Sequence, residues 1–177
     1  IHSNPTPGFA NEINLRKQLW ELAVQSSPDW ILCLDADEIF EDRVILQIRS
    51  LVNQLHVDVY AFRLFDFWDM EHYREDEFWN AHLRYFPLLV RYQPEFPYQW
   101  HETPLHCGRF PKNIMLLPTA LSDLRVKHFG WATEKDRAEK YNRYLQADPD
   151  GKYGSLEQYK SILDPAPNLK RWQEDER

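Results

Sequence analysis

The chain has 177 residues, 43% of them hydrophobic and 15% aromatic, and its formal net charge at pH 7 is -7. This length and composition fit one globular domain with a core of ordinary size. The negative charge argues against a nucleic-acid partner, because no basic stripe is available to replace phosphate counterions. We expect neither a signal peptide nor a membrane span, since no apolar run approaches the roughly 20 residues that cross a bilayer. The expected location is the cytoplasm or the inner face of the membrane.

The two cysteines share no spacing that is typical of a metal site. Cys33 lies inside an apolar run and is expected in the core, whereas Cys107 is expected to be a free thiol. Neither cysteine indicates an oxidising compartment. The chain starts at Ile1, and residues 1–9 read as a loop, so we interpret the sequence as a fragment of a larger domain.

The first third of the sequence predicts a helix, a strand and a second helix. Apolar residues recur at helical spacing over 10–25 and again over 44–55. Between them, residues 30–34 form a short apolar run of the kind found in a sheet covered on both faces. Ser, Pro and Asp residues at 26–29 separate the first helix from the strand.

The middle of the sequence predicts two more strands and two long loops. Residues 57–67 are rich in β-branched and aromatic side chains, which favours a strand. Residues 66–80 are polar and aromatic without a period, so we expect an irregular loop that lines a cleft. A strand is expected over 83–92, where Pro87 indicates an edge position or a bulge, and residues 93–111 read as loop.

The last third predicts short strands followed by helices. The strands are expected over 114–117 and 124–127. A Thr-Glu-Lys-Asp sequence resembling a capping box opens a helix over 133–145, and a short helix follows over 156–163. Residues 165–177 read as a charged, flexible tail. These elements together predict a single α/β domain.

The most informative segment is acidic and follows the apolar run directly. Asp35 and Asp37 are separated by one residue, and Glu38 comes next. Residues two apart on a strand point to the same side, and ligands of open α/β sheets bind at the carboxyl ends of strands. Two carboxylates there would suit a divalent cation, and their hard oxygens favour Mg²⁺ or Mn²⁺. The alternative is a polar loop that caps the next helix.

This segment carries a specific resemblance. Residues 30–42 (WILCLDADEIFED) resemble the Asp-x-Asp segment of family 2 glycosyltransferases, which have the GT-A fold. The resemblance implies that Asp35 approaches the sugar-nucleotide together with Glu38. It implies that Asp37 binds the metal that bridges the diphosphate. The helix over 10–25 matches the helix that precedes this strand in the family, and it carries a matching Arg16.

The resemblance also implies an incomplete fold. It covers residues 10–145 and implies a partial GT-A mixed sheet flanked by helices. The βαβ unit that holds the nucleotide base and ribose in the family should precede residue 10, so the chain is expected to be the carboxyl-terminal portion. An incomplete sheet would leave an exposed edge, which favours a homo-oligomer.

Two further motifs extend the resemblance. His101 and Glu102 match a loop in which the family has a carboxylate that accepts the proton of the acceptor hydroxyl. Glu102 is therefore the candidate general base and His101 a substrate contact, although a His-Glu pair is often plain surface. His128 follows a short strand and is the candidate third metal ligand beside Asp35 and Asp37. The alternative for His128 is a partly buried side chain among aromatic residues.

Aromatic and basic side chains supply the remaining candidates for substrate binding. Trp68 and Arg74 belong to the loop over 66–80, where flat rings and charged groups could hold a sugar. Arg74 or Arg84 could also neutralise a phosphate, because a guanidinium binds it through two hydrogen bonds. The alternative is a folded surface loop with some of its rings in the core.

The predicted function is a metal-dependent, inverting glycosyl transfer from a nucleotide-sugar to a hydroxyl of a glycan, lipid or protein, with Mn²⁺ or Mg²⁺ as cofactor. One alternative is a phosphohydrolase of the haloacid dehalogenase type, which also places Asp-x-Asp after an apolar strand. That class prefers Thr or Val where this chain has Ile39. The other alternative is a non-catalytic carbohydrate-binding fragment.

Overall fold

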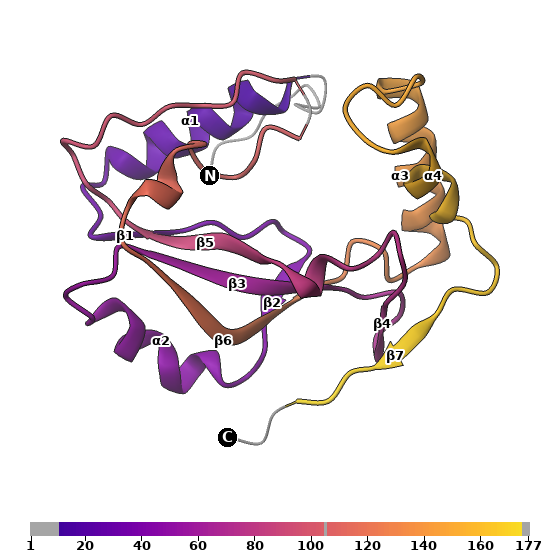
Figure 1. Ribbon diagram of the computed structural model, residues 1–177, viewed down its shortest axis with the longest axis horizontal. Helices are drawn as coiled ribbons and strands as arrows, with labels where there is room; N and C mark the ends of the chain where they lie inside the picture. The colour runs from indigo at the N-terminus through magenta and orange to yellow at the C-terminus, as the bar shows by residue number, and fades with distance from the viewer. Residues whose placement is uncertain (1–10, 105, 175–177) are drawn as a thin grey trace.

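The computed structural model describes residues 11–104 and 106–174. Five strands form one mixed sheet in the order β1-β5-β3-β6-β2, with helices on both faces (Figure 1). The predicted α/β class is therefore confirmed. The strands are β1 (Trp30–Leu32), β2 (Glu38–Phe40), β3 (Val59–Asp66), β5 (Tyr85–Arg91) and β6 (Thr119–His128).

The helices lie in three places around this sheet (Figure 1). Helix α1 (Glu12–Val24) covers one face, and α2 (Val44–Val52) covers the other. Helices α3 (Glu134–Ala147) and α4 (Leu156–Ser161) lie together beyond one end of the strands. Within the described part of the chain, no helix is both long enough and apolar enough to cross a bilayer.

Polar side chains fix the starts of the two longest helices. Asn11 accepts a hydrogen bond from the backbone N–H of Asn14 at the start of α1. Thr133 accepts one from the N–H of Asp136 at the start of α3. Both satisfy a backbone donor that has no partner inside the helix, and the expected cap before residue 134 is confirmed.

The sheet is antiparallel except at its centre. Strand β3 pairs parallel with β6 and antiparallel with β5. The β3–β5 register shifts at Pro87, because Tyr60 pairs with Leu89 and Ala61 with Pro87. Strand β5 lies inside the sheet, so the bulge predicted from Pro87 is confirmed and the alternative of an edge strand is wrong.

Alternating side chains of β3 build a core on each face of the sheet. Phe62 is fully buried in the cluster that α2 covers, and Val59 is fully buried in the cluster that α1 covers through Trp20. Burying a side chain as large as Phe62 stabilises the fold by roughly 1.5–3 kcal/mol. The two clusters hold the sheet between α1 and α2, so the loops at its ends are built on a rigid base.

Three local predictions were wrong. Residues 114–117 were expected to be a strand but contain the 3₁₀ helix η3 (Ile114–Leu116). The irregular loop over 66–80 contains β4 (His72–Arg74), and the expected flexible tail contains β7 (Leu169–Arg171). These two strands pair antiparallel as a second sheet, so each is ordered by a partner far away in the sequence. The loop predicted over 1–9 lies outside the described residues.

The outer strands of the main sheet are short. Strands β1 and β2 have three residues each and lie at its two edges. Leu32 at the end of β1 is 45% exposed, and Ile39 in β2 is 55% exposed. Both edges of the sheet thus carry an exposed apolar side chain, and homo-oligomer formation stays a prediction.

Candidate functional site

Strand register brings the key polar residues together. Asp35 and Asp37 lie in the connection between β1 and β2, and Glu38 is the first residue of β2. The β2–β6 register pairs Glu38 with His128, and the β3–β6 register pairs Asp66 with the same histidine. The backbone N–H of Phe129 also donates to the Asp37 carbonyl at 2.7 Å. The ends of β2, β3 and β6 therefore meet around His128.

The His128 side chain links two carboxylates and approaches a lysine. Its Nδ1 lies 2.8 Å from Asp66 Oδ1, and its Nε2 lies 3.5 Å from Asp37 Oδ2. Lys140, from α3, places its Nζ 3.3 Å from the same Asp37 oxygen. We call Asp37, Asp66, His128 and Lys140 the histidine cluster. It joins two carboxylates to two cationic groups.

The charges in this cluster shift each other's pKa values. Burial opposes the charged imidazole, but hydrogen bonds with Asp37 and Asp66 outweigh burial and raise the pKa of His128 to about 9. The neighbouring His128, and then Lys140, hold the pKa of Asp37 well below its ordinary value. Opposite charges at short range favour the ionised form of each partner. Asp37 is therefore an ionised carboxylate at neutral pH.

Asp35 and Glu38 are held by arginines. Arg16, from α1, donates to both oxygens of Asp35 at 2.8 Å and 3.3 Å, and Arg109 lies 3.6 Å from Asp35. Arg109 also donates to both oxygens of Glu38, whose side chain is fully buried. Burial opposes ionisation of Asp35, but Arg16 and Arg109 outweigh it and keep the pKa low. Glu38 thus holds Arg109 in place, and the contact of Glu38 with substrate stays a prediction.

The cluster fits a divalent cation in part. Neighbouring ligands of an octahedral ion lie about 3 Å apart for bonds near 2.1 Å, close to the 3.5 Å between Asp37 and His128. Asp66 orients the imidazole, as carboxylates do behind metal-binding histidines. Among the described residues, no group of three or more His, Cys, Asp or Glu side chains has metal-binding geometry. Asp35, the other carboxylate predicted as a metal ligand, is hydrogen-bonded to Arg16 instead.

These residues lie on the wall of a large cleft. Its volume is about 1140 Å³, and it is bounded by α1, the 33–37 segment, α3, Pro104, His106 and Arg109. Although the whole chain is acidic, basic side chains outnumber acidic ones on this wall. The charged lining residues are Arg16, Arg109, Lys140, Arg143, His128, Glu12, Asp35 and Asp37. A cleft with this lining suits an anionic ligand that also needs a few carboxylate contacts.

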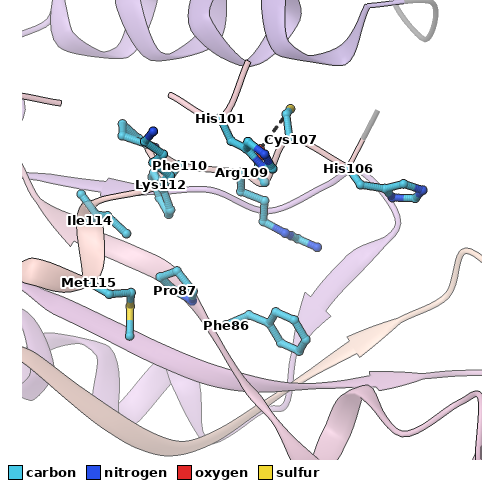
Figure 2. A pocket seen from close by; sticks show the side chains of 12 residues that line it. Phe86, Pro87, His101, His106, Cys107, Arg109, Phe110, Lys112, Ile114 and Met115 are labelled. Carbon is cyan, nitrogen blue, oxygen red and sulfur yellow. Dashed lines mark hydrogen bonds between the residues drawn. The ribbon is translucent and has the colours of Figure 1, made fainter. Parts of the chain in front are cut away.

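A smaller cavity of about 310 Å³ adjoins this cleft and shares Arg109 and His106 with it. Figure 2 shows its mainly apolar wall, with Phe86 and Pro87 opposite the 107–111 segment. His101 lies on this wall rather than in the large cleft. A substrate that contacts His101 would have to enter the smaller cavity, and this contact stays a prediction.

The candidate base lies at the surface beside α1. The Glu102 side chain is 65% exposed, and its Oε1 lies 2.5 Å from the Nζ of Lys17. Glu102 does not line the large cleft, but Pro104, two residues further along, does. The proton-accepting role of Glu102 stays a prediction.

Three predicted substrate-binding residues lie away from the cleft. Trp68 is 4% exposed and packs with Trp79 and Trp131. Arg74 is 2% exposed and is bound to residues of its own loop and of the segment after α4. Arg84 is exposed just before β5 and lines neither cavity. Trp68 and Arg74 are thus buried within the fold, and their contact with substrate stays a prediction.

Sequence reasoning missed the basic residues that surround the carboxylates. Arg109 lies in a segment that reads as loop, and Lys140 lies on a helix whose charged residues look like a solvated face. Arg109 binds Glu38 and Lys140 binds Asp37, and in each pair the two residues are more than 70 positions apart in the sequence. The available signal was the density of acidic residues at 35–42, because such a cluster needs nearby cations.

Comparison of the chain with protein-family models, with curated proteins and with solved structures finds no match.

Proposed function

We propose that this chain carries the catalytic site of a metal-dependent, inverting glycosyltransferase of GT-A type. The donor is a nucleotide-sugar, and the acceptor is a hydroxyl of a glycan, lipid or protein. One observation carries the proposal: Asp37 and His128 converge at the end of the sheet, on the wall of a cleft rich in basic side chains. The resemblance of residues 30–42 to the Asp-x-Asp segment gives this convergence its chemical meaning.

The cofactor is Mn²⁺ or Mg²⁺, held by Asp37 and His128. Asp66 keeps the His128 ring in orientation through the 2.8 Å contact with Nδ1. Ions of this kind are commonly bound by one or two protein side chains together with substrate phosphates, so two protein ligands suffice. When bound, the metal stabilises the negative charge that develops on the leaving diphosphate.

The basic wall of the cleft accounts for donor binding. Arg16 and Arg109 already hold Asp35 in a charged network, and both guanidiniums line the cleft. Guanidinium groups bind phosphate oxygens through paired hydrogen bonds. The proposal assigns the diphosphate of the donor to this wall and places its sugar toward Asp35.

Transfer proceeds by one displacement with inversion. The acceptor oxygen attacks the anomeric carbon and forms the new glycosidic bond, while the bond from that carbon to the diphosphate oxygen breaks. The diphosphate leaves with the bonding electrons. Glu102 takes the hydroxyl proton, for which its carboxylate must come within hydrogen-bonding distance of the acceptor.

The two alternative functions have weaker support. In a haloacid dehalogenase-type enzyme Asp35 would be the nucleophile, but Arg16 donates to both of its oxygens and reduces their reactivity. A simple carbohydrate-binding fragment would need exposed aromatic platforms, whereas Trp68, Trp79 and Trp131 are each less than 10% exposed. The basic cleft suits an anionic ligand, which a binder of neutral glycans does not need.

The test replaces Asp37 by Asn and uses Asp42→Asn as the matched control. Asp42 is exposed and belongs to the same acidic segment. The assay incubates each protein with Mn²⁺ and a panel of UDP- and GDP-sugars and measures release of the nucleoside diphosphate. We expect Asp37→Asn to lower the rate by about a hundredfold or more and Asp42→Asn to leave it unchanged. Near-normal turnover of Asp37→Asn would remove Asp37 from the mechanism.

A further inference from the structure

The ammonium group of Lys140 lies where a cation bound to Asp37 would be expected. Its Nζ is 3.3 Å from Asp37 Oδ2 and 4.4 Å from the centre of the Trp131 ring. The Lys140 side chain is only 16% exposed. A carboxylate on one side and an aromatic face on the other hold the charge in place, so this lysine is a built part of the cluster and not a solvated surface group.

Gly130 shows how closely the polar groups converge. A Cβ atom at this position would lie 2.0 Å from Lys140 Nζ and 2.5 Å from both Asp37 Oδ2 and His128 Nε2. The three polar atoms therefore surround one small volume above the backbone of residue 130. A metal bound to Asp37 and His128 would need bonds of about 2.0–2.2 Å to them, and would be forced close to the ammonium.

We infer that Lys140 is a resident counter-cation that competes with the metal for Asp37. This inference rests on the proposed function, since it concerns the metal of that site. Without metal, Lys140 neutralises Asp37 and keeps the cluster ordered. Metal binding requires the ammonium to move off Asp37 along the cleft wall, because two cations next to one carboxylate repel each other. The lysine thus weakens metal binding by the protein alone.

The competition also predicts coupling between metal and donor. Lys140 is a lining residue of the large cleft, so the displaced ammonium stays beside the place proposed for the diphosphate. An anionic ligand there would compensate the charge of Lys140 and free Asp37 for the metal. Metal and nucleoside diphosphate should therefore bind with positive cooperativity, as any two ligands that favour the same state do.

The experiment measures Mn²⁺ binding directly, by loss of the electron paramagnetic resonance signal of free Mn²⁺. Lys140→Met removes the charge but keeps the length, so we expect Mn²⁺ to bind about tenfold more tightly. Lys140→Arg keeps the charge and should bind Mn²⁺ as weakly as the unsubstituted chain. The matched control is Lys135→Met, on the same helix with a side chain 82% exposed, and it should change nothing.

The outcomes separate this inference from the proposed function. Equal Mn²⁺ affinity in the unsubstituted chain and in Lys140→Met would overturn the competition but leave the metal site standing. Absence of Mn²⁺ binding in every variant would overturn both. Circular dichroism spectra and urea midpoints identify a variant that has lost its fold. If Lys140→Met does so, Lys140→Arg is compared with the unsubstituted chain, and tighter Mn²⁺ binding by Lys140→Arg would contradict a role for the charge.

Discussion

Replacement of Arg74 by Ala tests whether this arginine supports the fold or binds substrate. Its Nε donates to Asp76 at 2.5 Å, one Nη donates to the Ser161 carbonyl at 2.6 Å, and the other donates to Asp164 at 3.1 Å. The guanidinium also lies over the Trp68 ring, 4.7 Å from its centre. The side chain therefore ties the loop after β3 to the segment that follows α4.

The expected cost follows from these contacts. Removing one partner of a buried ion pair usually costs about 3–5 kcal/mol. The carboxylates of Asp76 and Asp164 are 22% and 37% exposed, so water replaces part of the lost interaction and the lower end applies. We expect Arg74→Ala to lower the free energy of unfolding by about 3 kcal/mol. With a urea m-value of about 2 kcal/mol/M, the midpoint falls by about 1.5 M.

The assay is urea denaturation followed by tryptophan fluorescence, which reports on Trp68 and Trp79 beside the substituted position. The matched control is Arg84→Ala, because Arg84 is exposed and exposed substitutions usually stay within about 0.5 kcal/mol. An unchanged midpoint for Arg74→Ala, together with a loss of turnover, would refute the structural assignment and restore Arg74 as a substrate contact.

Two further predictions concern the candidate base and a buried thiol. Glu102→Gln should reduce turnover by about 10²–10⁴ while calorimetry shows unchanged UDP binding; an equal loss in Lys17→Met would mean that their ion pair only positions the loop. Burial raises the pKa of Cys107 to about 11, so about one thiol in a thousand is ionised at pH 8. Iodoacetamide should therefore modify Cys107 slowly in the folded chain and about tenfold faster per pH unit from 7 to 9, and rapid modification at pH 7 would contradict this.

The sequence predicted the elements that carry their own periodicity. The apolar spacing before residue 25, the β-branched run that became β3 and the Thr133 cap of α3 are local signals, and the structure confirms all three. Strands β4 and β7 were missed because each has only three residues. Such strands exist through their pairing, and a pairing between distant segments leaves no periodicity in either one.

The candidate site was predictable only in part, because only some of its residues belong to a local sequence pattern. Asp37 and His128 were singled out, and the strand register brings them within 3.5 Å. The roles of Arg109 and Lys140 depend on which loop and which helix pack beside the sheet end, and no local pattern contains that information. A charged residue such as Arg74 in an aromatic loop looks like a ligand contact in the sequence, and only the fold shows that its side chain is buried.

The parallel pairing of β3 with β6 determines when the histidine cluster is completed. Asp66 ends β3 and His128 ends β6, so residues 67–118 form a long excursion between the two strands. Closing so long an excursion costs chain entropy before any contact is gained, which makes distant pairing a slow step in folding. Nascent or partly unfolded chains would consequently hold the two halves apart, and the Mn²⁺ site that we propose would form only once the native topology is reached.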